Sequence, residues 1–301
     1  MSNERAENLL LIDGNNMAHR VFWTCKNLSY NGKSVSLLYG FFRSLIGLKK
    51  DFPEHFTVIA WDSKSERRMR ESKEGVEKGI IPSEYKANRI KSPEEEDVFK
   101  EMHEQMGLLR DGLNLAKVLQ VRVDGYEADD VLYTYALQND EAGGETVIVT
   151  SDKDYYQLLR PRIKIFDAMN QEMWTEERFI AESGYEPSKW VEAGAICGDK
   201  SDNIFGVSGW GQITANKYLI KYGSLAGIKT ALQSQEKKSK KEIDFLASAD
   251  RLQLALSLKQ MDRVPCVPRL RTRGPYDRKK IEEFFIGFGF ASLIKDTGRL
   301  V

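Results

Sequence analysis

The sequence predicts an α/β fold in which helices flank a mainly parallel central sheet. Short apolar runs alternate with longer stretches of helical periodicity through the first 180 residues, a pattern typical of layered α/β domains. Continuous apolar runs indicate strands buried on both faces, as in parallel sheets. The predicted strands cover residues 8–12, 56–61, 118–123, 146–149 and 163–166.

Helical periodicity follows most of these strands. Residues 35–48 repeat apolar side chains at helical spacing, and Ser92-Pro93-Glu94-Glu95 predicts a helix start with a capping box. Further helices are expected after residue 130, ending near Gly143, and over residues 187–196 and 212–222. Residues 63–91 show no clear period and are expected to be exposed.

Composition places the chain among globular proteins. Its 301 residues, 41% hydrophobic and 30% charged, suit one large or two ordinary domains. The first apolar run is far too short for a signal peptide or a membrane span, so we expect no membrane partner and a cytoplasmic location. The three cysteines and three histidines are scattered, which favours structural roles over disulfides or zinc sites.

Acidic residues follow the predicted strands. Asp13 ends the first strand and Asp62 follows the second, while Glu127, Asp129 and Asp130 follow the third. Asp152 and Asp154 follow the fourth, and Asp199 with Asp202 comes later in the chain. Because parallel strands deliver their carboxyl ends to one edge of a sheet, these acids are expected to converge in a crevice there.

Clustered carboxylates need a counter-charge. Like charges a few ångströms apart raise one another's pKa, and burial adds a desolvation cost. Mg²⁺ or Mn²⁺ would resolve this conflict, because hard oxygen ligands suit these ions, whereas no Cys/His pairing supports zinc. The alternative for Gly125–Asp130 is a solvated helix N-terminus, where acids are favoured by the helix dipole.

Basic residues are concentrated in two segments, although the chain has 45 acidic and 45 basic side chains. Residues 63–91 hold nine Lys/Arg against five Glu, and residues 263–280 hold seven Lys/Arg against one Asp. Such patches are typical of proteins that bind phosphates. We interpret the first segment as an arch over the crevice, with Lys86 and Arg89 facing a phosphate; the alternative is a mobile surface loop.

Glycines at 206, 209 and 211 predict a tight turn between two helices. Such a turn aims backbone N–H groups and a helix N-terminus at a phosphate, so it can hold a nucleic-acid backbone without reading sequence. The position of this turn, directly after Asp199 and Asp202, supports this interpretation.

The chain resembles the 5′-nuclease (flap endonuclease) family, in particular stand-alone bacteriophage 5′-3′ exonucleases and the 5′-nuclease domain of bacterial DNA polymerase I. The matching segments occur in the family's order, from residue 9 to residue 222, and residues 284–293 resemble its closing helix. These segments are Leu11-Ile12-Asp13-Gly14-Asn15, Trp61-Asp62, Tyr85-Lys86-Ala87-Asn88-Arg89, Glu127-Ala128-Asp129-Asp130, Thr150-Ser151-Asp152-Lys153-Asp154, Gly198-Asp199-Lys200-Ser201-Asp202-Asn203-Ile204 and the turn 206–211.

The resemblance implies a PIN-like catalytic domain over residues 1–180, with a helical arch at about 63–105. It also implies a helical DNA-binding region over residues 181–301, with a helix-three-turn-helix element at about 188–222. The expected activity is metal-dependent hydrolysis of DNA phosphodiesters at 5′ ends, flaps and single-to-double-strand junctions, as in primer or flap removal during replication. Possible partners are RNA/DNA hybrids and replication proteins, and a monomer is expected.

The resemblance also implies site residues. Two Mg²⁺ or Mn²⁺ ions would be bound by Asp13, Asp62, Glu127, Asp129, Asp130, Asp152, Asp154, Asp199 and Asp202. Lys86 and Arg89 would polarise the scissile phosphate, and Asp130 would be essential for cleavage. DNA would be contacted by Tyr85, stacking on an unpaired base, and by Gly206, Val207, Ser208, Gly209, Gly211, Gln212 and Lys217, with K⁺ at the turn.

One departure from the family concerns phosphate binding. Relatives commonly carry Lys-Thr-Ala after the turn, whereas this chain has Ile213 before Thr214-Ala215, so Lys217 or Lys221 would have to supply the charge. Two alternatives for function stay open. One is a non-catalytic, structure-selective DNA-binding protein, and the other is a PIN-like ribonuclease, which needs fewer acids and no glycine turn.

Overall fold

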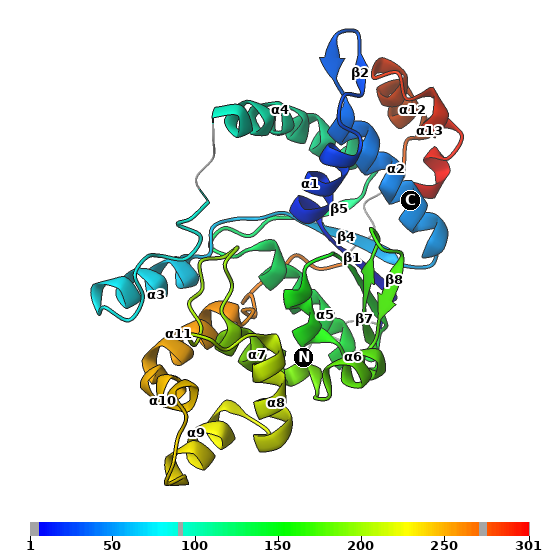
Figure 1. Cartoon of the computed structure of the whole chain (residues 1–301). Coiled ribbons are helices and arrows are strands. Elements are labelled where there is room, and N and C mark those ends of the chain that lie inside the picture. Colours follow the sequence, from blue (N-terminus) through cyan, green and yellow to red (C-terminus); the bar gives the residue numbers. More distant parts are fainter. Residues whose placement is uncertain (1–5, 90–92, 271–275, 301) are drawn as a thin grey trace.

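A six-stranded sheet forms the centre of the computed structural model, which describes residues 6–89, 93–270 and 276–300 (Figure 1). The strand order is β5-β4-β1-β6-β7-β8, and every neighbouring pair is parallel except β7 with β8. The predicted α/β class is confirmed. The strands are β1 (Leu9–Asp13), β4 (Phe56–Ala60), β5 (Leu119–Val121), β6 (Thr146–Val149), β7 (Ile163–Asp167) and β8 (Glu172–Trp174), with a separate hairpin of β2 (Ser29–Tyr30) and β3 (Lys33–Ser34).

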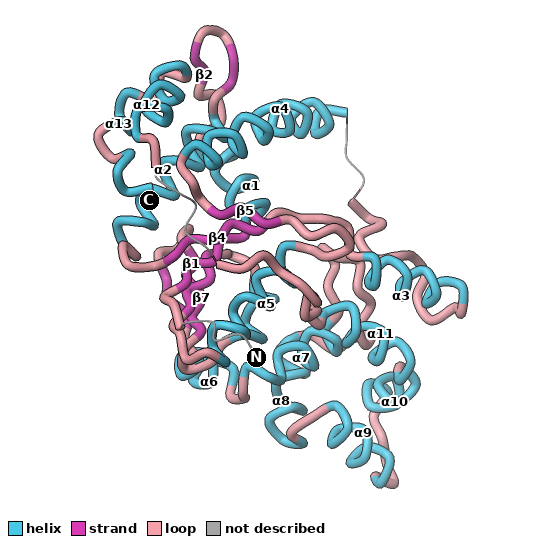
Figure 2. Tube along the Cα trace, turned by 180° about the vertical axis from the view of Figure 1, so that it is seen from behind, coloured by secondary structure: helices cyan, strands magenta, loops and turns pink. Residues whose placement is uncertain are grey.

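Both faces of the sheet are covered, which explains why its strands are continuously apolar. Successive side chains of a strand point to opposite faces. Leu9 and Leu11 pack in one core and Leu10 and Ile12 in another, all with no exposed surface. Helices α1, α2, α4 and α12 lie on one side of the sheet and α5, α6 and α7 on the other (Figures 1 and 2).

The helices alternate with strands in the first half of the chain and follow one another in the second. The first half contains α1 (Gly14–Thr24), α2 (Ser36–Asp51), α3 (Glu66–Glu77), α4 (Pro93–Leu115), α5 (Ala128–Glu141) and the 3-10 helix η1 (Lys153–Leu158). The second half contains α6 (Glu176–Ser183), η2 (Pro187–Lys189), α7 (Trp190–Cys197), α8 (Gln212–Tyr222), α9 (Leu225–Ser234), α10 (Lys240–Ala247), α11 (Ala249–Lys259), α12 (Arg278–Gly287), α13 (Ala291–Ile294) and η3 (Thr297–Leu300).

Residues 63–91 differ from the prediction. Instead of an exposed irregular segment, they contain α3, which is capped by the Ser65 side chain and carries buried residues Arg68, Ser72 and Gly75 on one face. This face packs against α11, more than 170 residues later in the chain. Helix α4 begins at Pro93 as predicted, while the predicted cap Ser92 lies outside the described residues.

The C-terminal segment was also predicted incompletely. Residues 284–293 do not form one helix. Helix α12 ends at Gly287, and Gly289 then adopts a left-handed conformation with φ of 76° before α13 begins at Ala291. A Cβ at Gly289 would lie 2.4 Å from the Tyr30 ring, so the β2–β3 hairpin approaches this turn closely. The division of the chain at residue 180 stays a prediction.

The strand order places a topological switch point at the carboxyl edge of the sheet. Strand β1 lies between β4 and β6, and the connections from these strands run to opposite sides of β1. Open parallel sheets bind ligands at such a switch point. Asp13 ends β1 at this position. Within the described ranges, no helix has the length and apolar character needed to cross a membrane.

Candidate metal centre and nucleic-acid interface

Four carboxylates gather at the carboxyl edge of the sheet. Asp13 ends β1, Asp62 follows β4, Asp152 follows β6, and Asp129 lies in the first turn of α5. Burial raises the pKa of Asp129 most, and the charges of Asp13, Asp152 and Asp62 raise it further, so each of the three acts on Asp129 electrostatically. We call Asp13, Asp62, Asp129 and Asp152 the strand-end carboxylates.

Each strand-end carboxylate is oriented by one short hydrogen bond. The Asp13 side chain accepts from the Asn16 N–H at 2.9 Å, and Asp62 accepts from the Ala128 N–H at 2.9 Å. Asp152 accepts from the N–H of Asp154 at 2.8 Å, and Asp129 accepts from the buried Tyr155 hydroxyl at 2.7 Å. Helix caps and one phenol therefore hold the four side chains in place.

Burial and mutual repulsion make this group of acids unfavourable when charged. Burial raises the pKa of Asp13 to about 7, and the charges of Asp62 and Asp152 add to the effect. Desolvation likewise raises the pKa of Asp129, which is half-buried, and that of Asp62 and Asp152, although both of these residues keep solvent-exposed surface. A divalent cation would stabilise the charged forms, so the donor chemistry fits Mg²⁺ or Mn²⁺.

A second set of acids lies beside the first. Asp154, Asp199 and Asp202 each place one carboxylate oxygen within 4.8 Å of the others, and we call them the second carboxylate group. Burial alone would raise the pKa of Asp199, but hydrogen bonds from Lys259 and Ser201 outweigh it and lower this pKa to about 2. The charges of Asp202 and Asp199 raise the pKa of Asp152, so the two sets of carboxylates interact electrostatically.

Glu127 connects the acids to the predicted arch. Its carboxylate accepts hydrogen bonds from Lys86 Nζ at 2.7 Å, from the Tyr85 hydroxyl at 3.1 Å and from Arg68 Nη1 at 3.3 Å. Arg89 Nη2 contacts Asp202 at 2.6 Å. Lys86 and Arg89 therefore lie beside acids of the site, and their contact with a phosphate stays a prediction.

The backbone of residues 84–89, which we call the arch base after the predicted arch, is attached to the loop that carries Asp199 and Asp202. The Lys86 N–H donates to the Asp202 carbonyl at 2.9 Å, and Asn88 Nδ2 donates to the Lys200 carbonyl at 2.6 Å. Asn203 Nδ2 donates in return to the Glu84 carbonyl at 2.6 Å. Lys86 has a left-handed φ of 57°, a conformation that these contacts hold.

Tyr85 does not fit the predicted stacking role. Its side chain is 5% exposed, and its hydroxyl donates to Glu127 and Asp202, both at 3.1 Å. The ring therefore cannot present a face to an unpaired base. Tyr85 instead orients two carboxylates from different parts of the chain.

Asp130 also differs from its predicted role. It has no exposed surface, and its two oxygens accept from Arg68 Nη1 and Nη2, both at 2.8 Å. The N–H groups of Glu127 and Asp262 donate to the same carboxylate at 3.1 and 2.7 Å. Because four donors satisfy it, Asp130 is removed from the set of direct metal ligands and acts by positioning Glu127.

The glycine turn matches the predicted backbone but not every predicted contact. A Cβ at Gly206 would lie 2.3 Å from the Gly198 nitrogen, so the two segments can approach only with glycine. Val207 is buried and its N–H donates to the Ile196 carbonyl, which removes it from the proposed DNA contacts. Ser208, Gly209, Gly211, Gln212 and Lys217 are exposed, and Gly206 is half-buried.

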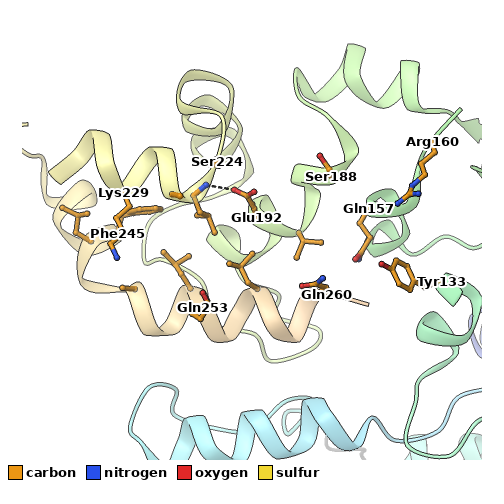
Figure 3. Close-up of a pocket in the computed structure, with 17 residues that line it drawn as sticks. Tyr133, Gln157, Arg160, Ser188, Glu192, Ser224, Lys229, Phe245, Gln253 and Gln260 are labelled. Carbon is orange, nitrogen blue, oxygen red and sulfur yellow. Dashed lines mark hydrogen bonds between the residues drawn. The ribbon is translucent and has the colours of Figure 1, made fainter. Parts of the chain in front are cut away.

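A cavity of about 620 Å³ lies apart from the acids, among α7, α9, α10 and α11 (Figure 3). Its lining is mixed, with apolar side chains such as Leu225, Leu252 and Leu256 and polar side chains such as Gln157 and Gln260. None of the predicted acids lines it.

Several residues that build the site were not predicted. Arg68 was counted only as part of a basic exposed segment, although 3% of it is exposed. Asn15 and Asn16 accept from the Asp62 N–H and the Ser151 hydroxyl at 3.1 and 3.2 Å, so they join the ends of three strands. Lys259 contacts Asp154 and Asp199. Of these residues, only Asn15 and Asn16 could have been identified from the sequence, because they directly follow the strand-end acid Asp13.

Comparison with known proteins gives the family context. The model of the 5′-3′ exonuclease N-terminal, resolvase-like domain matches residues 8–184, and the 5′-3′ exonuclease C-terminal SAM fold matches residues 185–272. The chain is 32% identical over 298 residues to the thermostable DNA polymerase I of Thermus aquaticus, covering 97% of this chain and 33% of that protein. It thus spans about a third of this polymerase.

A 5′-3′ exonuclease of Aquifex aeolicus is 32% identical over 221 residues, which cover 73% of this chain and 71% of that protein. Among solved structures, the bacteriophage T5 flap endonuclease in a complex with DNA and metal ions has a TM-score of 0.70 at 20% identity, covering 98% of both chains. The T5 5′-exonuclease with bound zinc has a TM-score of 0.69 at 21% identity, also over 98% of both chains. These likenesses show the fold.

Replacing Arg68 tests the structural role of its contact with Asp130. Arg68→Met is expected to lower the free energy of unfolding by about 3–5 kcal/mol, because it leaves a fully buried carboxylate without its partner. Urea unfolding measures this change. Arg263→Met is a matched control, because Arg263 and its partner Glu141 are about half exposed, and it should change stability by less than about 1 kcal/mol. Equal effects of the two substitutions would contradict the assignment.

Removing metal should make stability depend on pH in an unusual direction. Because the pKa of Asp13 rises from 3.8 to about 7 on folding, the folded state binds more protons than the unfolded chain between these values. Stability in EDTA should therefore fall as the pH rises from about 4 to about 7. Excess Mg²⁺ should reduce this fall. Calorimetric melting temperatures measured across this pH range, in EDTA and in excess Mg²⁺, test the prediction. The same pH dependence of stability with and without Mg²⁺ would contradict it.

Proposed function

The chain belongs to the 5′-3′ exonuclease family, and we propose that it is a metal-dependent 5′-3′ exonuclease and 5′-flap endonuclease acting on DNA. The observation that carries this proposal is the convergence of the strand-end carboxylates with the second carboxylate group, beside Lys86 and Arg89. Such an arrangement has little use in a protein that only binds DNA, because it costs stability without metal.

We propose that each set of acids binds one metal ion. We infer that the strand-end carboxylates hold one Mg²⁺ or Mn²⁺ ion and that Asp154, Asp199 and Asp202 hold a second. Glu127 lies beside them and can join either site once its contacts to Lys86 and Tyr85 open. When bound, two such ions supply an activated water on one side of a phosphodiester and charge stabilisation of the leaving oxygen on the other.

The chain's own cations receive the scissile phosphate. Lys86 and Arg89 have partly exposed side chains, 26% and 56%, and each contacts an acid of the site. A phosphate entering the crevice offers both residues a new anionic partner, and the bonds to the Asp202 and Lys200 carbonyls hold the arch base in position meanwhile. Their positive charges then lie where negative charge develops in the transition state.

The glycine turn and α8 are proposed to grip duplex DNA. The exposed backbone of Ser208, Gly209 and Gly211 leads into the N-terminus of α8 with Gln212, where a helix favours a phosphate. Lys217, exposed on the same helix, supplies a charge that Ile213, 88% exposed, cannot. We propose further that carbonyls of this turn, including Gly206, bind K⁺.

The wider biological assignment rests on the family. Proposed substrates are DNA with 5′ ends or flaps, and RNA in a hybrid, as in primer removal during replication. We also propose that the protein acts as a monomer, alongside replication proteins, in a bacterial cytoplasm or a phage-infected host cell.

Cleavage of an end-labelled 5′-flap duplex tests the proposal. With Mg²⁺, the wild-type chain should release junction-proximal products or short 5′ fragments, and EDTA should abolish them. Asp129→Asn should lose on the order of 10² or more in rate, because one preorganised charge at the metal is removed. Flap binding, measured by gel shift, should persist because the turn is untouched.

Asp124→Asn is the matched control for this substitution. Asp124 precedes the same helix, but its side chain is 84% exposed and pairs with Arg122, so its loss should leave the rate within about twofold. Flap binding without cleavage by the wild-type chain would favour the non-catalytic DNA-binding alternative. Cleavage of RNA but not DNA would favour the ribonuclease.

A further inference from the structure

The aliphatic part of the Lys259 side chain packs against a glycine of a neighbouring helix. Lys259 is the last residue of α11, which packs against α7. A Cβ placed on Gly194 of α7 would lie 3.0 Å from Lys259 Cε. The glycine therefore makes room for the lysine stem, which leads the ammonium group into the second carboxylate group.

The ammonium group is satisfied there by carboxylates. Lys259 Nζ donates to both oxygens of Asp154, at 2.6 and 2.7 Å, and to Asp199 Oδ2 at 2.8 Å. The Lys259 side chain is 7% exposed. Charge-assisted bonds of this length are among the stronger contacts in proteins, so they hold the ammonium in place.

The strand-end carboxylates lack such a cation. Among the described residues, no Lys or Arg side chain donates a hydrogen bond to a carboxylate oxygen of Asp13, Asp62, Asp129 or Asp152; the guanidinium of Arg122 contacts only the backbone carbonyl of Asp62. Lys86 and Arg89 act on Asp62, and Lys259 acts on Asp152, only through longer-range electrostatic attraction. An ion that enters the second carboxylate group therefore meets a hydrogen-bonded ammonium, whereas an ion that enters the strand-end carboxylates does not.

We propose that Lys259 is an internal counter-ion that competes with the second divalent ion for Asp154 and Asp199, so that the protein binds its two ions with unequal affinity. The inference rests on the proposed metal-dependent function and adds to it. An ammonium and a divalent cation repel strongly at hydrogen-bond distances. The second ion must therefore displace Lys259, while the first enters the strand-end carboxylates without such competition.

Mn²⁺ binding to the full chain tests this directly. Electron paramagnetic resonance counts free Mn²⁺ during a titration and needs no DNA or cleavage. The wild-type chain should show one tight and one weaker step. Lys259→Met keeps the length of the stem but removes the charge, so it should tighten the weaker step on the order of tenfold or more. The tight step should change by a smaller factor, because Lys259 acts on Asp152 only through longer-range electrostatics.

Two further variants sharpen the test. Lys189→Met removes a lysine that pairs with Glu192 outside both carboxylate sets, and it should leave both steps unchanged. Gly194→Ala keeps every charge but crowds the Lys259 stem, so it should tighten the weaker step by a smaller factor. Because alanine suits a helix interior better than glycine, this variant tests the inference even if Lys259→Met folds poorly without metal.

The outcomes separate the inference from the proposed function. Two equal steps in the wild-type chain, or a weaker step unchanged in both Lys259→Met and Gly194→Ala, would overturn the role of Lys259 and leave a two-metal nuclease intact. If no variant bound Mn²⁺ at millimolar concentration, the inference and the metal-dependent function would fail together.

Discussion

Repulsion among the carboxylates at the edge of the sheet is the constraint around which this protein is built. Seven acids of the two carboxylate sets, together with Glu127, lie close enough to raise one another's free energy when charged. Cations from distant segments of the chain offset this repulsion. Lys86 pairs with Glu127, Arg89 pairs with Asp202, and Lys259 of α11 pairs with Asp199. Under the proposed function, metal ions would complete this balance, and folding, metal binding and catalysis would then depend on the same electrostatics.

The same balance explains how the two halves of the chain are joined. Arg68 of α3 pairs with Asp130 at the start of α5 and also donates to the carbonyls of Leu258 and Gln260 at the end of α11. The arch base is tied to the loop of Asp199 and Asp202 through backbone contacts. The acids of the sheet, residues 84–89 and the end of α11 are therefore positioned by one another.

The sequence predicted the parts of the site that depend on local order. Apolar runs marked β1, β4 and β6, and an acid after each run was enough to place Asp13, Asp62 and Asp152 at one edge, because parallel strands share it. The sequence could not show that the Arg68 side chain of α3 is buried, because the helix that covers it, α11, lies far away in the chain. For the same reason, the burial of Tyr85 and the saturation of Asp130 became visible only in three dimensions. Lys259 carried no local signal at all.

The most direct test of the central claim is an anomalous diffraction map from crystals of the protein grown with Mn²⁺. The account predicts a strong peak bonded to oxygens of the strand-end carboxylates, at the distances of about 2.0–2.3 Å typical of metal–oxygen ligation. A second peak at Asp154, Asp199 and Asp202 should be weaker, or should appear with Lys259 displaced. Ordered carboxylates with no peak among them, at saturating Mn²⁺, would contradict the claim that this crevice is a metal centre.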